Sequence, residues 1–181
     1  MPPPFASDED FPELIIHELT QLRAALQGLS TAQAASRPTV SALSLSGLAL
    51  HSAQVVHGWL LAAERAPEPV AAQEIPQLSA HIGFSQMYAG SEDLGHMPVD
   101  EVLAQLDRVI DFVRTEGPGL FELSVEIPLG DHQWPGSGPF VTGRWVWQHL
   151  ATEVARHAGH ADILRESIDG ASAAELTAAE G

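Results

Sequence analysis

The sequence contains no cysteine and few basic residues, and both shortages exclude classes of protein. With no cysteine among 181 residues, the chain has no disulfide, no thiolate metal ligand and no cysteine nucleophile, so any thiol chemistry requires a thiol from outside. Eight Lys and Arg stand against 24 Asp and Glu, which gives a net charge of −16. This balance argues against binding to nucleic acid or to an anionic membrane surface, because both need clustered basic side chains.

Long apolar runs are also lacking. No stretch approaches the roughly 20 apolar residues of a membrane span. The N-terminus, MPPPFASDED, is acidic and proline-rich and has no apolar segment of the kind found in signal peptides. We therefore expect a cytoplasmic protein. Hydrophobic residues make up 45% of the chain and charged residues 18%, which is an ordinary globular composition, and the length suits one domain.

Four stretches show the apolar period of an amphipathic helix. The predicted helices cover 11–29, 41–65, 98–116 and 143–168. The long connections 66–97 and 118–142 separate the second helix from the third and the third from the fourth; long connections in compact domains usually cover or line something. We expect one short helical turn around 79–89 and one extended or hairpin-like excursion within 120–141, where apolar and polar residues alternate.

These elements predict an all-α fold, a four-helix bundle over residues 11–170. Residues 1–10 are expected to form a disordered tail, because their prolines donate no backbone hydrogen bonds and their acidic residues have no evident partners. The alanine-rich residues 171–181 are expected to form a flexible tail.

Ionisable side chains lie on the apolar stripes of two predicted helices. His51 lies on the stripe of the second helix, and Glu153 and His157 lie on that of the fourth. Residues i and i+4 differ by about 40° around a helix axis, so Glu153 and His157 project side by side. Bundles build metal sites from inward carboxylates and imidazoles, and three protein ligands leave a position open, as in catalytic sites.

A simpler interpretation applies to each of these residues alone. A single His on an apolar stripe is usually a hydrogen-bonded core residue, and a Glu-x-x-x-His pair is usually a surface pair. Together they favour a metal site, because a carboxylate on a core stripe is costly without a compensating cation. Nitrogen and oxygen ligands suit Zn, Ni, Fe, Mn or Co; zinc is the first expectation.

Further histidines lie near this pattern. His160, three residues after His157, is placed to line the same cavity or to hydrogen-bond a ligand. His149 lies one turn before Glu153, near the edge of the stripe. His57 falls about 240° from His51 around its helix, so we expect it to be exposed or to lie behind the ligands. The remaining histidines, which join no pattern, are His17, His81, His96 and His132.

The four tryptophans are interpreted mainly as core residues. Trp134 is the exception, because it lies in the Gly/Pro-rich loop WPGSGPF rather than on a helix. We therefore expect Trp134 to line a pocket, where it would contact a cofactor or substrate. No nucleophile elbow of the Gly-x-Ser-x-Gly type occurs in the sequence.

The residues on these stripes also resemble a known superfamily. The segment RWVWQHLATEVARHAGHADILRESIDG (144–170) closely resembles the last helix of the DinB-like superfamily, nearest to an actinobacterial branch related to mycothiol-dependent maleylpyruvate isomerase. The segment LALHSAQVVHGWL (48–60) resembles the second helix, with a His near its start and a Trp eight residues later. It departs from the pattern near Val56, where an acidic residue is frequent. The resemblance covers about 11–168, except 66–97, and implies a four-helix bundle.

The resemblance implies a divalent metal held by His51, Glu153 and His157. Many relatives carry His at the position of Glu153, whereas the isomerase branch carries Glu; the position of His160 is often Gln. Several relatives use a low-molecular-weight thiol, mycothiol or bacillithiol, as cosubstrate. A cation at the open position would lower the pKa of that thiol and hold the thiolate, which attacks an electrophile. The family's habit of dimerising makes a homodimer an expectation.

Three functions follow from these observations. The first is a metal-dependent thiol S-transferase or thiol-assisted isomerase, whose partners are a low-molecular-weight thiol and a small electrophile. The second is metal-dependent hydrolysis, in which the same site lowers the pKa of a water molecule. The third is a non-enzymatic bundle with a vestigial metal site.

Overall fold

The computed structural model describes residues 10–84, 86–131 and 133–178, and most of them are helical. The helices are α1 (Phe11–Leu26), α2 (Thr31–Ala34), α3 (Leu45–Glu64), α4 (Ile75–Leu78), α5 (Val99–Thr115), α6 (Gly143–Asp169) and α7 (Ala173–Ala178). Two 3-10 turns, η2 (Ala72–Glu74) and η3 (Ala80–Ile82), flank α4. The predicted predominance of helix is confirmed. The predictions for residues 1–9 and 179–181, and His132, lie outside the described residues.

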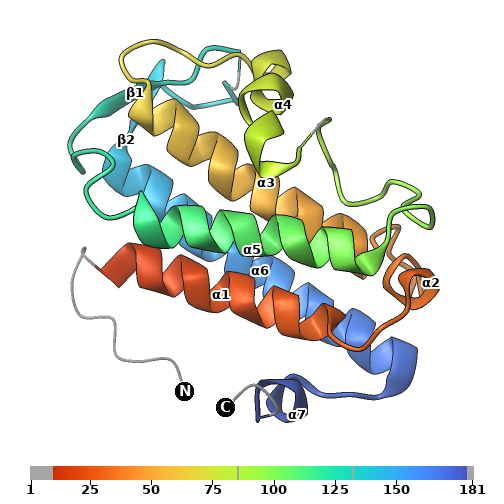
Figure 1. Cartoon of the computed structure of the whole chain (residues 1–181). Coiled ribbons are helices and arrows are strands. Elements are labelled where there is room, and N and C mark those ends of the chain that lie inside the picture. Colours follow the sequence, from red (N-terminus) through yellow and green to blue (C-terminus); the bar gives the residue numbers. More distant parts are fainter. Residues whose placement is uncertain (1–9, 85, 132, 179–181) are drawn as a thin grey trace.

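Four long helices pack side by side (Figure 1). Helices α1 and α6 run in one direction and α3 and α5 in the other. Helix α1 contacts α3, α5 and α6, and α3 also contacts α5 and α6. Each long helix places leucine in the shared core; Leu19, Leu48, Leu106 and Leu150 are all at most 1% exposed. The 3.6-residue period of the sequence therefore produces one continuous apolar core.

Polar caps fix where the two site-bearing helices begin. The Ser44 hydroxyl accepts a hydrogen bond from the backbone N–H of Gly47 at the start of α3 (3.1 Å). The Thr142 hydroxyl accepts one from Trp145 at the start of α6 (3.2 Å). Gly170, at φ 82°, ends α6 in the left-handed conformation that glycine adopts without strain. These caps place α3 and α6 near the predicted ranges, with α3 four residues shorter at its start.

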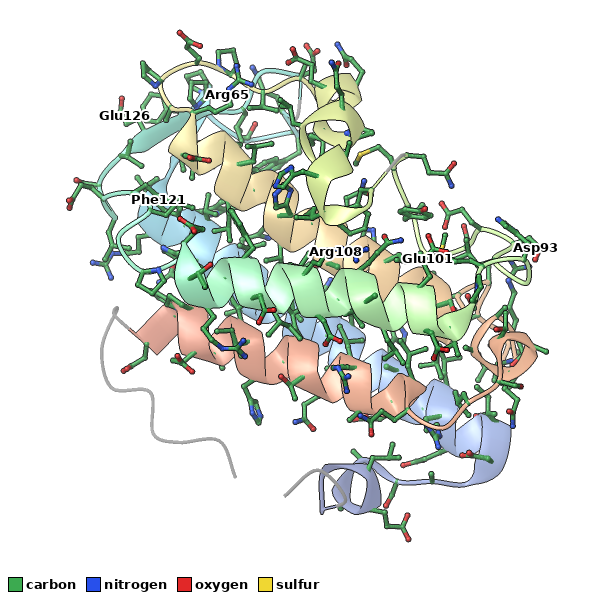
Figure 2. All side chains as sticks on the ribbon, in the orientation of Figure 1. Arg65, Asp93, Glu101, Arg108, Phe121 and Glu126 are labelled. Atoms are coloured by element: carbon green, nitrogen blue, oxygen red, sulfur yellow. The ribbon has the colours of Figure 1, made fainter. Side chains whose placement is uncertain are left out.

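The connection from α3 to α5, residues 65–98, is hereafter the crossover. Because α3 and α5 run in the same direction, the crossover travels the length of the molecule (Figure 1). Its helical turns lie at 72–82. The turn predicted around 79–89 corresponds to η3, whereas η2 and α4, which precede it, were not predicted. Pro76 lies in the first turn of α4, and Gly83, at φ 101°, ends η3. Arg108 of α5 donates to the Ile82 carbonyl (2.7 Å) and ties the crossover to the bundle (Figure 2).

The connection from α5 to α6 contains the predicted extended excursion. Strands β1 (Glu126–Pro128) and β2 (Phe140–Thr142) pair antiparallel, with Ile127 opposite Val141. The hairpin lies at the end of the molecule where α5 ends and α6 begins (Figure 1). The loop that joins its two strands carries Trp134, which stacks on Trp145 at the start of α6.

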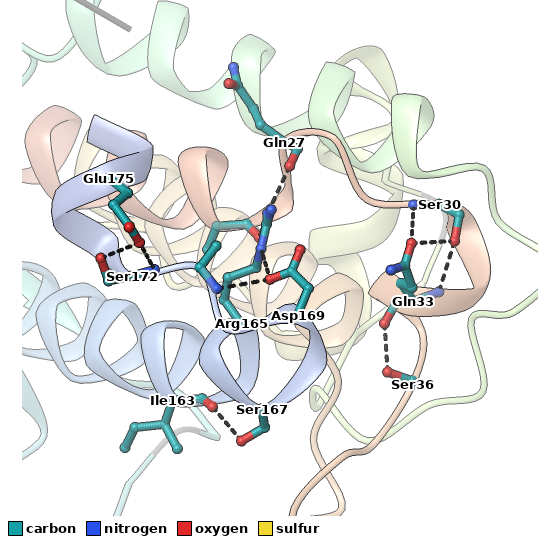
Figure 3. A network of polar contacts seen from close by, with 12 residues as sticks. Gln27, Ser30, Gln33, Ser36, Ile163, Arg165, Ser167, Asp169, Ser172 and Glu175 are labelled. Atoms are coloured by element: carbon teal, nitrogen blue, oxygen red, sulfur yellow. Dashed lines mark hydrogen bonds and ion pairs between the residues drawn. The ribbon is translucent and has the colours of Figure 1, made fainter. Parts of the chain in front are cut away.

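The last turns of α6 hold the end of α1 in place through a buried arginine. The Arg165 side chain of α6 donates to the carbonyls of Ala25 (2.9 Å) and Gln27 (2.7 Å) at the end of α1, and to the carboxylate of Asp169 (3.0 Å) (Figure 3). These bonds satisfy carbonyls that the end of a helix leaves unpaired. Helix α7, which contacts α1, was not predicted. Within the described ranges, none of the helices has the length and apolar character needed to cross a membrane.

Candidate metal centre

His51 of α3 and Glu153 and His157 of α6 converge between the two helices; we refer to them as the His-Glu-His cluster. One ligand atom of each lies within 4.8 Å of the others. Oε1 of Glu153 lies 3.1 Å from Nε2 of His157 and 3.8 Å from Nε2 of His51. The two imidazole rings meet edge to face, with centroids 5.1 Å apart. The i, i+4 spacing on α6 and the antiparallel packing of α3 thus bring together the three residues singled out from the sequence.

The crossover orients the His51 ring. Nδ1 of His51 lies 2.8 Å from the Tyr88 carbonyl oxygen, so Nδ1 carries the proton and Nε2 offers its lone pair toward Glu153. Gln54, 2% exposed, holds the same segment: its Nε2 donates to the Gln86 carbonyl and its Oε1 accepts from the Tyr88 N–H, both at 2.7 Å. Sequence analysis missed Gln54.

Burial and charge set the protonation of the two α6 residues. Burial raises the pKa of Glu153, but the charge and hydrogen bond of His157, with the charges of His149 and His51, outweigh it and hold that pKa below its ordinary value. Burial lowers the pKa of His157 by more than the attraction of Glu153 raises it. At neutral pH the carboxylate is therefore charged and His157 is neutral, which are the forms that bind cations.

This donor set fits a divalent metal. Ligand atoms around a tetrahedral zinc stand about 3.3–3.6 Å apart, because their bonds to the metal are about 2.0–2.2 Å long. The two measured separations from Oε1 of Glu153, 3.1 Å and 3.8 Å, lie on either side of that range. Nδ1 of His157 is buried without a hydrogen-bond partner among the described residues, so the polar contact of that ring is at Nε2, inside the cluster. Two nitrogens and one oxygen also leave a position open for a further ligand.

The other sequence-predicted residues lie around the cluster. His160 is exposed, and its ring centroid lies 6.4 Å from that of His157. Trp134 stacks on Trp145 (5.4 Å), which in turn stacks on His149 (4.7 Å), one turn before Glu153. Trp134 therefore belongs to an aromatic cluster between the His-Glu-His cluster and the hairpin, with its side chain 42% exposed.

His57 lies on another face of α3, and the expectation of an exposed or supporting position is wrong. It is 1% exposed and its Nδ1 lies 2.8 Å from the Ser79 hydroxyl. Its ring packs edge to face on Phe112 (4.9 Å) and His81 (5.5 Å). The physical reason is that the crossover covers this face of α3, which helical periodicity alone does not reveal. Burial, followed by repulsion from His81, lowers the pKa of His57 to about 4.

Comparisons with known proteins agree with this architecture. A conserved protein from Enterococcus faecalis, known from a crystal structure, is 16% identical; the match covers 89% of this chain and 96% of that one, with a TM-score of 0.55. At this identity the likeness concerns the fold alone. A search of curated proteins gives no match. The family model of mycothiol S-transferases matches residues 11–170.

This family model places the chain in the DinB-like superfamily, and the helical fold agrees with that placement. Within it, the chain belongs to the mycothiol S-transferase family.

Proposed function

We propose that this protein is a divalent-metal-dependent enzyme that transfers a low-molecular-weight thiol of the mycothiol type to a small electrophile. The observation that carries the proposal is the convergence of His51, Glu153 and His157 within 4.8 Å. Membership of the mycothiol S-transferase family supports the thiol, and the absence of cysteine means that no internal thiol competes for the site. The four long helices are proposed to form the DinB-like bundle.

The residues of the cluster would hold the cation, and their surroundings would set its affinity. When bound, a divalent cation lowers the pKa of a thiol and stabilises its thiolate. Glu153 supplies a negative charge that offsets part of the cation's charge, while the Tyr88 carbonyl keeps the His51 lone pair directed at the site. In the transfer, the thiolate sulfur forms the new bond to the electrophilic atom, and the leaving group departs with its electron pair. In a thiol-assisted isomerisation the same sulfur would leave again.

Metal-dependent hydrolysis is the alternative. The three-residue donor set leaves an open position that suits a water molecule as well as a thiol. Under this alternative the protein turns over esters or amides without added thiol, and the turnover is lost in His157→Ala.

Elemental analysis of untagged protein purified without chelator tests the metal first. We expect about one transition-metal ion per chain, absent from both Glu153→Ala and His157→Ala. Wild-type protein that is metal-free and takes up no Zn, Ni or Mn contradicts the proposal and favours a non-enzymatic bundle with a vestigial site.

Thiol titration of the metal-loaded protein tests the reaction. We expect mycothiol to perturb the visible spectrum of the Co-substituted protein and to be conjugated to members of an electrophile panel. Thiol-independent hydrolysis that is lost in His157→Ala would favour the alternative. If mycothiol neither changes the spectrum nor is conjugated to any electrophile, a role for the thiol is ruled out.

A further inference from the structure

An apolar cavity of about 200 Å³ lies along α3, beyond the His-Glu-His cluster. It follows the face of α3 on which His51 lies: Val55 and Trp59, one and two turns after His51, line it, as does Ala62. One helical turn is about 5.4 Å along the axis, so the cavity begins one turn from the cluster. Ile75 of α4 and Leu129, next to β1, close its other sides.

The cavity offers no charged group to a ligand. None of its lining residues has a charged side chain, and besides the Trp59 indole its one polar side chain is Gln54. The Gln54 amide is already engaged, because its nitrogen donates to the Gln86 carbonyl and its oxygen accepts from the Tyr88 N–H, both at 2.7 Å. A charged ligand group placed here would lose hydration without gaining a partner of opposite charge, which is unfavourable.

The crossover segment 86–88 contacts both the cavity and the cluster. The Met87 side chain, 47% exposed, lines the cavity. The carbonyl of Tyr88, the next residue, lies 2.8 Å from Nδ1 of His51. On the α6 side, the Trp59 ring lies edge-on to His149 at 5.6 Å, one turn before Glu153. A molecule in the cavity would therefore rest against the residues that position the cluster.

From this geometry we infer that the cavity binds the uncharged apolar part of the electrophile, an aromatic ring or a short alkyl chain. Its size matches that ligand, because a cavity of about 150 Å³ lined by apolar side chains is known to hold benzene. The role of the cavity in catalysis rests on the proposed function. Its ability to bind an apolar ligand does not depend on that function. The substrate class that follows is an uncharged aromatic or alkyl electrophile whose reacting atom projects from the cavity toward the cluster.

Cavity-filling variants test the inference in the metal-loaded full chain. Ala62→Leu adds volume at the half-buried wall of the cavity on α3. Gly58→Leu is a second filling variant, because a Cβ at Gly58 points at the Ile75 side chain at ordinary contact distance (3.5 Å). The matched control is Ala155→Leu, the same substitution at an exposed position of α6. Circular dichroism and elemental analysis verify that each variant is folded and retains its metal.

Binding of toluene and of benzoate, followed by titration calorimetry, is the first readout. We expect toluene to bind wild type and Ala155→Leu equally, and at least tenfold more weakly to a folded filling variant; benzoate, of similar size but charged, should not bind. Three results would overturn the inference. Wild type does not bind toluene, or it binds benzoate with the same affinity as toluene, or it binds toluene with no higher affinity than both filling variants do.

Transfer of mycothiol to benzyl bromide is the second readout. We expect Ala62→Leu to raise KM at least tenfold while metal content is unchanged. If toluene binding follows the expected pattern but no thiol transfer occurs, the apolar site stands and the proposed function fails. If transfer occurs with the same KM in wild type and in both filling variants, the proposed function stands and the substrate assignment fails.

Discussion

Gln54 connects two parts of the molecule that sequence analysis treats separately, α3 and the crossover. Its two hydrogen bonds fix residues 86–88 against α3, and the Tyr88 carbonyl then fixes the His51 ring. A partner that orients a metal-binding histidine usually changes metal affinity by about 10–100-fold when it is lost. The hydrogen bonds of Gln54 go to the backbone of Gln86 and Tyr88 and not to the three cluster residues, so its effect is one of positioning.

Gln54→Leu is accordingly expected to weaken zinc binding by about 10–100-fold without removing a ligand. Competition with a chromophoric chelator measures this. The matched control is Gln105→Leu on α5: Gln105 is equally buried (1% exposed) and its Oε1 has no hydrogen-bond partner among the described residues. The control should keep wild-type zinc affinity and lose no stability, because it removes an unsatisfied oxygen. Equal affinities for wild type and Gln54→Leu would show that residues 86–88 do not position His51.

The lowered pKa of the buried His57 predicts that stability depends on pH, independently of the metal. Its pKa is about 4 in the folded protein and about 6.5 in an unfolded chain. Between these values the unfolded state binds more protons, so the free energy of unfolding falls as pH decreases from 6.5 toward 4. The loss is about 3 kcal/mol over the whole window. Urea denaturation of chelator-treated protein at a series of pH values measures it.

The variant His57→Gln should flatten this dependence, because glutamine can still bond to the Ser79 hydroxyl but does not titrate. His96→Gln, at an exposed position of the crossover, should leave the dependence unchanged. An identical pH dependence in wild type and His57→Gln would assign the effect to other groups.

The cluster residues could be identified from the sequence because each is an ionisable side chain on an apolar stripe. The period of α6 fixed Glu153 and His157 relative to each other, and the structure brings His51 to them; their role as ligands stays a prediction. Gln54 and Tyr88 could not be identified in this way. The group that contacts His51 is a backbone carbonyl, which every residue has, and its position depends on the path of the crossover.

At the scale of elements, the junction of the crossover with α3 depends on two glycines. A Cβ at Gly47 would overlap the backbone carbonyl of Gly90, where the crossover passes the first turn of α3. Because the neighbour is backbone and the Gly90 N–H is itself held by the Glu92 carboxylate (2.9 Å), the contact has little room to adjust. The close approach lies two residues from Tyr88, so it also fixes the carbonyl that orients His51.

Gly47→Ala is therefore expected to destabilise the protein by about 1–3 kcal/mol and to weaken zinc binding. Gly159→Ala, in the middle of α6, is the matched control, because a Cβ there meets nothing within 4 Å. It should stabilise the helix by about 0.5–1 kcal/mol and leave zinc binding unchanged. Thermal denaturation and chelator competition measure both. A Gly47→Ala protein as stable as Gly159→Ala contradicts the predicted overlap.

The long helices could be predicted because three or more turns of periodic sequence identify a buried stripe. The first helix ends at Leu26 rather than at Leu29, because Gly28, at φ 74°, turns the chain. The turns at 72–82 are too short to show a period, and contacts such as that of Arg108 with the Ile82 carbonyl hold them. From the sequence alone, Arg165 would be expected on the surface. In the structure it is only 6% exposed, beneath the end of α1.

At the scale of the whole molecule, a metal in the cluster would join α3 to α6. Its ligands His51 and Glu153 lie about 100 positions apart in the chain. The unfolded chain does not hold these residues together, so the metal binds the folded state and stabilises it. Free zinc at 100 times its Kd adds about 2.7 kcal/mol, which corresponds to a rise of about 5–10 °C in Tm for a domain of this size.

Differential scanning calorimetry with zinc and with chelator measures this shift. His51→Ala/His157→Ala, which lacks a residue on each helix, should show no rise in Tm on addition of zinc. A rise of the same size in the double variant would place zinc binding elsewhere.

The contact between α1 and α6 also has a consequence for synthesis of the chain. Helix α1 leaves the ribosome first but packs against α6, the last long helix to be made. The His-Glu-His cluster is incomplete until His157 has been made, and the buried core is incomplete until Leu164 has been made. During translation the earlier helices expose their apolar stripes, and such nascent chains are substrates for chaperones and proteases. Premature stop codons anywhere before α6 should thus yield fragments that are degraded.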